Sequence, residues 1–246
     1  SNLKAPIIVV GIKEAEMVKY ACNCFHGLKV AFANEVGVLC KALGIDSHRV
    51  MEVFCKDTKL NLSPYYLKPG FAFGGSCLPK DLRAITYKAK AVDVDVPVLN
   101  SILKSNREHI DRAVDMVLRT GKKRVGVLGL SFKPGTDDLR ESPMVTLIET
   151  LLGKGIKLMI FDREVEIAKL FGANKEYIER EIPHISSIMC SSLDEVLAQS
   201  EVVVITKKSE EFQVDSLRAD RDRIVIDLAR LIEGTKSQGN YHGIGW

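Results

Sequence analysis

The sequence lacks several features that would assign it to a class at once. Its six cysteines form no CxxC pair, no stretch approaches the roughly 18 apolar residues of a membrane span, and no charged and then apolar leader opens the chain. These absences argue against a disulfide scaffold, a paired-cysteine zinc site and a membrane protein. They predict a cytoplasmic protein with mostly buried, reduced thiols and no membrane partner.

An excess of charge of one sign is also lacking. Lysine and arginine number 35 and aspartate and glutamate 32, so the formal charge of +3 gives no argument for a nucleic-acid partner. Hydrophobic residues make up 46% and charged residues 27%, which excludes a disordered or low-complexity chain. At about 100 to 200 residues per domain, a chain of 246 residues predicts two modest domains.

The first half of the chain has helical periodicity. From Glu14 to Leu43 there is no proline, and apolar residues recur at helical spacing, which predicts one long helix. Because such a helix spans roughly 45 Å, part of it is expected to pack on a second subunit and form a homodimer. Further helices are predicted at 47–54, 79–87 and 98–118, with a long polar loop at 56–69.

The second half alternates strands with helices. β-Branched and apolar runs predict strands at 124–130, 157–161, 202–206 and 224–228. Helical patterns lie between them, at 142–153, 165–171 and 194–199. The alternation predicts a parallel, doubly wound sheet. We therefore expect an α/β protein: an all-helical central and dimerisation domain over residues 1–121, then a mostly parallel, Rossmann-like domain over residues 122–246.

A polar stripe interrupts the apolar surface of the long helix. Four residues within about 80° of arc, at 100° per residue, form it: Lys19, Asn23, His26 and Asn34. The stripe is either a solvated face, as most charged helix faces are, or a binding surface. Cys22, Cys24 and His26 do not predict a metal site, because residues two apart on a helix point about 200° from each other.

The run GGSCLPKD, residues 74–81, is the strongest local signal. Its two glycines let the backbone approach a ligand closely, and Cys77 precedes a helix whose N-terminal dipole favours a thiolate. Lys80 and Asp81 supply a cation and a candidate base or water-positioning acid in the first helical turn. This pattern is typical of a nucleophile, and the alternative is a buried cysteine beside a glycine turn.

A basic loop follows the first predicted strand of the α/β half. Lys133 and Arg140 lie beyond the carboxyl end of that strand, where doubly wound folds bind nucleotides. The sequence contains no GxGxxG fingerprint, so a nucleotide is favoured over a dinucleotide. A solvated basic loop is the alternative.

Four motifs together resemble the nucleotide-sugar 6-dehydrogenases, the family that includes the UDP-glucose and GDP-mannose enzymes. They are EMVKYACN, FANE, GGSCLPKD and FKPGTDDLRESP, in the family's order and separation. The stretches YYLKPGFAFGGSCLPKD and ANKEYIEREIPHIS are most similar to the GDP-mannose branch of the family. The resemblance implies GDP-mannose as substrate, with UDP-glucose or another UDP-sugar as the alternative.

The resemblance implies a role for each matching residue. Cys77 is implied as the catalytic cysteine, and Lys19 and Asn23 as the pair that stabilises negative charge on the reacting oxygen. Asp81 is implied to position water. Nine positions match residues that hold the sugar nucleotide: His26, Asn34, Asn61, Tyr65, Tyr66, Lys68, Phe71, Gly74 and Lys133. Two positions match residues that reach the NAD cofactor: Lys80 and Arg140.

The implied reaction is the NAD-dependent, four-electron oxidation of the sugar's C6 alcohol to a carboxylate, through a thiohemiacetal and a thioester on Cys77. Family members begin with an NAD-binding Rossmann domain, and the 246 residues are expected to correspond to the two domains that follow it. We therefore expect this chain to be inactive by itself. The rival interpretation is a non-catalytic nucleotide-binding and dimerisation module.

Overall fold

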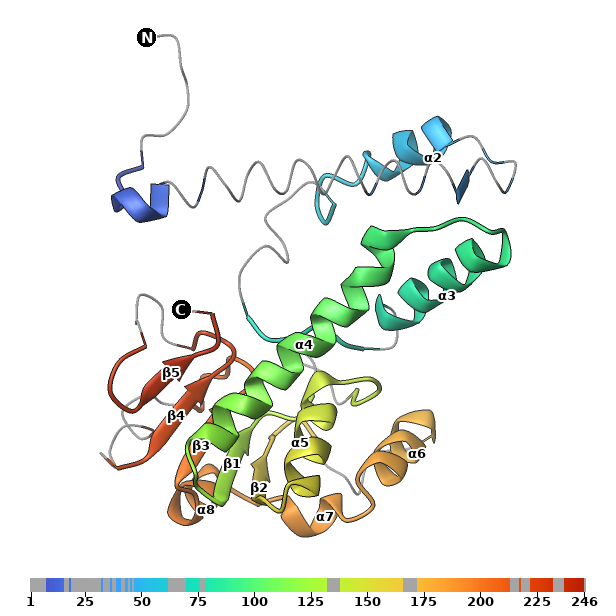
Figure 1. Ribbon diagram of the computed structural model, residues 1–246. Helices are drawn as coiled ribbons and strands as arrows, with labels where there is room; N and C mark the ends of the chain where they lie inside the picture. The colour runs from blue at the N-terminus through green and yellow to red at the C-terminus, as the bar shows by residue number, and fades with distance from the viewer. Residues whose placement is uncertain are drawn as a thin grey trace. The chain divides into compact units, whose positions relative to one another are not determined.

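The computed structural model describes most of the second half of the chain and parts of the first, namely residues 8–15, 18, 32, 36, 39–40, 43, 45, 47–61, 70–75, 78–131, 138–165, 172–212, 217, 222–231 and 237–245. The chain divides into two compact units. The first comprises Ser1–Tyr65 with Ile85–Ser101, and the second comprises Tyr66–Ala84 with Ile102–Trp246. The second unit contains the sheet (Figure 1).

The regular elements described ahead of the sheet are helices, joined by irregular stretches such as residues 55–61 and 70–75. They include α2 (Ser47–Phe54), α3 (Leu78–Ala91) and α4 (Pro97–Arg119), which match helices predicted from the sequence. Pro79 and Pro97 stand in the first turns of α3 and α4, where a missing N–H costs no helical hydrogen bond. Of the helix predicted from Glu14 to Leu43, the described residues 14–15, 18, 32, 36 and 39–40 are helical, and most others lie outside the described residues.

The second unit holds one parallel sheet with the strand order β2-β1-β3-β4-β5. Its strands are β1 (Arg124–Leu128), β2 (Lys157–Phe161), β3 (Val202–Ile205), β4 (Ile224–Asp227) and β5 (Tyr241–Gly243). The helices among them are α5 (Pro143–Gly153), α6 (Gly172–Glu181), α7 (Ile185–Ile188) and α8 (Leu193–Gln199). The predicted parallel α/β fold is confirmed.

Helices cover both faces of this sheet (Figure 1). Val202 and Val204 of β3 share a core with α4 and α5, whereas Val203 and Ile205 share a core with α8. This alternation follows from the two-residue period of a strand. The carboxyl half of α4 therefore belongs to the compact unit of the sheet, although the sequence assigns it to the helical domain. The domain boundary at residue 121 stays a prediction.

Three elements depart from the pattern in the sequence. β5 has three residues, too few for a strand period to be recognised, and α6 buries only Ile178 among the side chains described in it. α7 is a single turn of four residues. The helix predicted at 165–171 begins at Val165, which is not helical, and its remainder lies outside the described residues.

No helix within the described residues is both long and apolar enough to cross a membrane. The described cysteines are free thiols: Cys40 is buried, Cys190 is half-buried and Cys55 is exposed. The exposure of Cys55 departs from the expectation of mostly buried thiols. Among the residues described, no three His, Cys, Asp or Glu side chains gather as a metal site, and the absence of a metal stays a prediction.

Candidate functional site

The loop between β1 and α5, residues 129–142 and here called the β1–α5 loop, is closed at its base by hydrogen bonds. The Ser142 hydroxyl donates to the Leu130 carbonyl at 3.1 Å and accepts the Met144 N–H as the N-cap of α5. The backbone N–H groups of Leu130 and Ser131 donate to the Asp162 carboxylate at 2.7 and 3.1 Å. The described ends of the loop, 129–131 and 138–142, are therefore fixed against each other and against β2.

A buried ion pair supports the start of this loop. Lys207, which follows β3, donates from Nζ to Asp162 Oδ1 at 2.8 Å, to Glu164 Oε2 at 2.6 Å and to Ser131 Oγ at 3.1 Å. Burial raises the pKa of Asp162, but hydrogen bonds from Lys207 and from the Leu130 and Ser131 amides outweigh it and leave that pKa below its usual range. We call Asp162 and Lys207 the Asp162–Lys207 clamp.

The segment 70–75, which leads to the predicted nucleophile, is fixed to the described part of α4. The Asn106 side chain accepts the Phe73 N–H and donates to the Phe73 carbonyl, both at 2.9 Å. His109 Nε2 lies 2.8 Å from the Gly70 carbonyl oxygen, and its ring centroid lies 6.4 Å from that of Phe71. Two polar side chains one helical turn apart thus hold an otherwise irregular backbone in place.

Glu141 joins segment 70–75 to the end of the β1–α5 loop. The Gly75 N–H donates to the Glu141 carbonyl at 3.2 Å, and the two guanidinium nitrogens of Arg83 donate to the Glu141 carboxylate at 2.9 and 2.5 Å. A Cβ at Gly74 would collide with the Glu141 carbonyl and with Pro143, so only glycine allows this approach. The glycines of the GGSCLPKD run therefore allow close contact between two backbones.

Five of the predicted site residues have described side chains or, for Gly74, backbone. Phe71, Gly74, Lys80 and Arg140 belong to the second unit, and Phe71 packs against its core. Asn61 belongs to the first unit and donates to the Phe54 carbonyl at 3.3 Å. The backbone of Asp81 is part of α3. The other predicted site residues lie outside the described residues: Lys19, Asn23, His26, Asn34, Tyr65, Tyr66, Lys68, Cys77 and Lys133.

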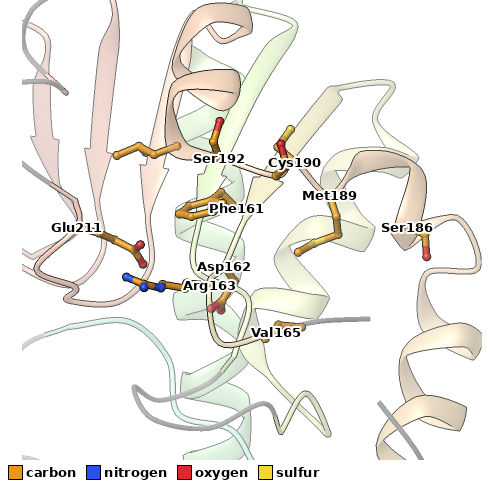
Figure 2. Close-up of a pocket in the computed structure, with 11 residues that line it drawn as sticks. Phe161, Asp162, Arg163, Val165, Ser186, Met189, Cys190, Ser192 and Glu211 are labelled. Atoms are coloured by element: carbon orange, nitrogen blue, oxygen red, sulfur yellow. The ribbon is translucent and has the colours of Figure 1, made fainter. Parts of the chain in front are cut away.

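A half-open cavity of about 670 Å³ lies beyond the carboxyl end of β2. Figure 2 shows Phe161, Asp162 and Arg163 entering it from β2 and the turn that follows, with Ser186 and Glu211 on opposite sides in this view. Cys190 also lines it, and burial together with the Glu195 charge raises the pKa of that thiol. Cys190 therefore favours the neutral thiol, unlike a nucleophile.

The described residues of the sheet edge do not fit a dinucleotide. In dinucleotide-binding Rossmann folds an acidic residue further along the chain accepts hydrogen bonds from the ribose. Here Asp162 stands at the end of β2, but both its carboxylate oxygens already accept hydrogen bonds from the protein. The occupied Asp162 carboxylate agrees with the missing GxGxxG fingerprint. Arg140, which is predicted to reach the cofactor, pairs with Asp138 within its own turn, and its side chain is 42% exposed.

Two models of one protein family match the chain. The central-domain model of the UDP-glucose/GDP-mannose dehydrogenase family matches residues 13–108, and the UDP binding domain model of the same family matches residues 126–234. The chain belongs to the UDP-glucose/GDP-mannose dehydrogenase family. The family resemblance of the four sequence motifs is confirmed.

The chain is more similar in sequence to GDP-mannose 6-dehydrogenases than to a UDP-glucose 6-dehydrogenase of the same family. GDP-mannose 6-dehydrogenases of Pseudomonas savastanoi and Pseudomonas aeruginosa are each 51% identical over 100% of the chain, and the UDP-glucose 6-dehydrogenase of Haloferax volcanii is 34% identical over 95%. The chain spans 56%, 56% and 52% of these proteins, so it matches about half of their length.

A solved structure of the dehydrogenase family agrees with the fold. The 1.55 Å crystal structure of a ternary complex of GDP-mannose dehydrogenase from Pseudomonas aeruginosa matches with a TM-score of 0.92 and 51% identity, covering 99% of this chain and 56% of that one. A UDP-glucose dehydrogenase from Pyrobaculum islandicum matches with a TM-score of 0.59 and 32% identity, covering 100% of this chain and 54% of that one.

Several residues that build the site are absent from the sequence prediction. Lys207 lies in the charged run TKKSEE, which is typical of a solvated surface, and Asp162 has the place of a residue that ends a strand. Asn106 and His109 lie on a helix with many polar residues. The one available signal was Asp162 itself, because an acidic residue directly after a buried parallel strand lies at the edge where ligands bind.

Proposed function

We propose that this chain serves in the NAD-dependent, four-electron oxidation of GDP-mannose to GDP-mannuronate. The observation that carries the proposal is the 51% identity over the whole chain to GDP-mannose 6-dehydrogenases. The lower identity of 34% to a UDP-glucose 6-dehydrogenase favours GDP-mannose over a UDP-sugar. A non-catalytic nucleotide-binding and dimerisation module is the rival, and the GGSCLPKD run favours the enzyme.

Cys77 is the proposed nucleophile. The C6 alcohol loses a proton and a hydride to give an aldehyde, and the Cys77 thiolate adds to that aldehyde to form the C–S bond of a thiohemiacetal. Loss of a second hydride from C6 gives a thioester, and NAD would accept both hydrides. Water then hydrolyses the thioester, which breaks the C–S bond and releases the carboxylate and the thiol. Lys19 and Asn23 supply a positive charge and a hydrogen bond where the oxyanion develops. Asp81 positions the water from the first turns of α3.

The proposed nucleotide-sugar site uses the two loops that Glu141 joins. Lys133 supplies a cation from the β1–α5 loop, and Phe71 and Gly74 belong to the segment leading to Cys77. The remaining proposed contacts are His26, Asn34, Asn61, Tyr65, Tyr66 and Lys68. The hydrogen bonds at Phe73, Gly70 and Gly75 support this assignment, because a fixed backbone places a nucleophile without further ordering.

NAD is the hydride acceptor that the family implies. Because the described residues of the sheet edge do not fit a dinucleotide, we assign the nucleophile and the sugar-nucleotide contacts to the 246 residues and derive no geometry for hydride transfer. Lys80 and Arg140 are proposed to reach the cofactor. Its main platform is proposed to lie outside the 246 residues, since the relatives have nearly twice their length.

Calorimetry on the 246-residue chain tests the substrate. GDP-mannose is expected to bind at least about tenfold more tightly than UDP-glucose, a difference of about 1.4 kcal/mol. Lys133→Ala is expected to weaken GDP-mannose binding by about 1.5 to 3 kcal/mol, the value of a charge-assisted hydrogen bond. Equal affinities for the two sugars would contradict the substrate, and unchanged binding by Lys133→Ala would contradict that contact.

Alkylation separates the enzyme from the rival module. Under limiting iodoacetamide, Cys77 is expected to react faster than the exposed Cys55. Added GDP-mannose is expected to slow the alkylation of Cys77 but not that of Cys55. The buried Cys40 and the half-buried Cys190 are internal controls on the same chain. Peptide mass spectrometry gives each rate. If Cys77 reacts no faster than Cys55, the rival module is favoured.

Absorbance at the NADH band tests the cofactor assignment. With GDP-mannose and NAD in excess, the isolated chain is expected to produce no NADH, because positioning is worth about 7 to 11 kcal/mol of barrier. Sustained NADH production would contradict the proposal that the cofactor platform lies outside these residues.

We propose further that the chain forms a homodimer through the helix from Glu14 to Leu43. The length of that predicted helix and the exposed apolar side chain of Val18, a described helical residue within it, support the proposal. Sedimentation velocity at micromolar concentration is expected to give the mass of a dimer. A monomer there would contradict the interface.

A further inference from the structure

The Asp162–Lys207 clamp is built around one short stretch of backbone, Leu130 and Ser131. Asp162 Oδ2 accepts the N–H groups of both residues, at 2.7 and 3.1 Å, and lies 3.3 Å from the Ser131 hydroxyl. Lys207 Nζ donates to the same hydroxyl at 3.1 Å. The two charged side chains therefore meet at the point where the chain leaves β1 and enters the β1–α5 loop.

A buried ion pair as a whole contributes little net stability, although removing one member alone is costly. Asp162 and Lys207 have side chains 0% and 6% exposed, and apolar residues of similar volume often replace buried pairs without loss of stability. The pair fixes the backbone instead, because its two side chains make directional hydrogen bonds with two amides and one hydroxyl, and an apolar pair would make none of these bonds.

The position of the clamp in the sequence links it to ligand binding. Lys133, the cation proposed to contact the nucleotide sugar, is two residues from Ser131. At the far end of the loop, Ser142 donates to the Leu130 carbonyl, so the same two residues also fix the return of the chain into α5. Leu130 and Ser131 are therefore held both by the clamp and by Ser142, at the two described ends of the loop whose sequence includes Lys133.

We propose that Lys207 and Asp162 are positioning residues for the nucleotide sugar and act through the β1–α5 loop and its Lys133. This inference rests on the proposed function. Lys207 touches no ligand in this scheme. Its ammonium group fixes Asp162 and Ser131, and these fix the start of the loop from which Lys133 binds. A double-mutant cycle measures such a coupling directly.

The experiment compares four forms of the 246-residue chain: unchanged, Lys207→Met, Lys133→Ala and the double variant. Dissociation constants for GDP-mannose are measured by NMR titration, which reaches weak affinities. Lys207→Met is expected to weaken binding about tenfold when Lys133 is present and less than about twofold in the Lys133→Ala background. A solely structural role would give the same loss in both backgrounds.

Two further variants control for folding. Lys157→Met removes an exposed lysine at the opposite end of β2 and is expected to leave binding unchanged. Glu164→Gln weakens the clamp from its more exposed side, where the Glu164 side chain is 36% exposed, and keeps the test available if Lys207→Met does not fold. It is expected to weaken binding about threefold, again only with Lys133 present.

Hydrogen exchange gives a second measurement on the same samples. The Leu130 and Ser131 amides are expected to exchange faster in Lys207→Met and in Glu164→Gln than in Lys157→Met. Equal losses with and without Lys133, or unchanged exchange at both amides, would overturn this inference alone. Failure of the unchanged chain to bind GDP-mannose would overturn the proposed function and the inference with it.

Discussion

The β1–α5 loop is held at its two ends by ion pairs of opposite character. At its start, the side chains of Lys207 and Asp162 are 6% and 0% exposed and their charged atoms lie 2.8 Å apart. At its end, the side chains of Arg83 and Glu141 are 53% and 35% exposed and lie 2.5 Å apart. The exposed pair is the shorter one, yet water competes for it and salt screens it. Burial, and not distance, decides how much each pair contributes.

Substitutions in the buried pair are expected to cost more stability than substitutions in the exposed pair. Removing one member of a buried pair leaves an uncompensated charge, whereas removing one member of an exposed pair returns the other to water. Both pairs connect parts of the proposed site, so a loss of ligand binding does not by itself distinguish them. The free energy of unfolding does distinguish them, because losing the buried pair is expected to lower it severalfold more than losing the exposed pair.

The largest effect is expected for Lys207→Met. It leaves the buried Asp162 carboxylate without its ammonium partner, and such losses typically cost about 3 to 5 kcal/mol of unfolding free energy. Urea denaturation of the chain, followed by circular dichroism, measures it. Lys157→Met, at the exposed start of β2, is the matched control and is expected to change stability by less than about 0.5 kcal/mol. A cost below about 1 kcal/mol for Lys207→Met would remove the contrast between the pairs.

Gly74→Ala is expected to cost about 1 to 3 kcal/mol, the range for overpacking. Its Cβ would collide with the Glu141 carbonyl and with Pro143, and would separate segment 70–75 from the end of the loop. GDP-mannose affinity is expected to fall with stability, measured by calorimetry and denaturation. Gly153→Ala is the control, since nothing lies within 4 Å of a Cβ there and the residue ends α5. An unchanged Gly74→Ala variant would show that the contact is not a constraint.

The pH dependence of stability tests the contribution of the buried Asp162 carboxylate. The pKa of Asp162 is held below its ordinary 3.8, so its contribution to stability is present above that pH and is lost as the pH falls through the folded-state pKa. Each unit of depression is worth about 1.4 kcal/mol. Denaturant midpoints between about pH 5 and pH 2 are expected to fall less steeply in Asp162→Asn than in the unchanged chain. Denaturant midpoints that fall equally steeply in both chains would contradict a stabilising role of the Asp162 carboxylate.

The elements with a clear composition or cap are the ones that the sequence predicts. The apolar and β-branched runs of β1, β2 and β3 and the Ser142-Pro143 start of α5 agree with the structure, because each has enough residues to show its composition or its cap. β5 does not, since three residues beside glycines carry no pattern. Gly74 is predicted as a site residue, but for contact with a ligand. The described structure adds that its missing Cβ admits the Glu141 backbone.

The clamp could not be predicted because its members are far apart in the chain. Asp162 and Lys207 are brought together only by the parallel pairing of β2 with β1 and of β1 with β3. In the sequence, Lys207 belongs to a run of charged residues, and such runs usually face solvent. Strand order is a tertiary property, so a pair that depends on it leaves no local signal. The same holds for Arg83 and Glu141, 58 residues apart.

The smallest effect is expected at the exposed pair. Arg83→Met and Glu141→Gln are each expected to change unfolding free energy by less than about 1 kcal/mol, with a coupling of about 0.2 to 1 kcal/mol in the double variant. The hydrogen bond to Glu141 raises the pKa of Arg83, but that guanidinium is charged at any pH used here. The Gly75 N–H still reaches the Glu141 carbonyl in every variant, because that bond is made by backbone.

Salt dependence distinguishes this weak pair from the buried one. Raising the ionic strength from about 0.05 to 1 M is expected to abolish the coupling of Arg83 with Glu141 while leaving the cost of Lys207→Met nearly unchanged, since screening acts on exposed charges. Urea denaturation at both salt concentrations measures the two quantities on the same chain. A coupling above about 2 kcal/mol that persists in 1 M salt would mean that Arg83 and Glu141 are shielded from water, and the contrast between the two ends of the loop would then be wrong.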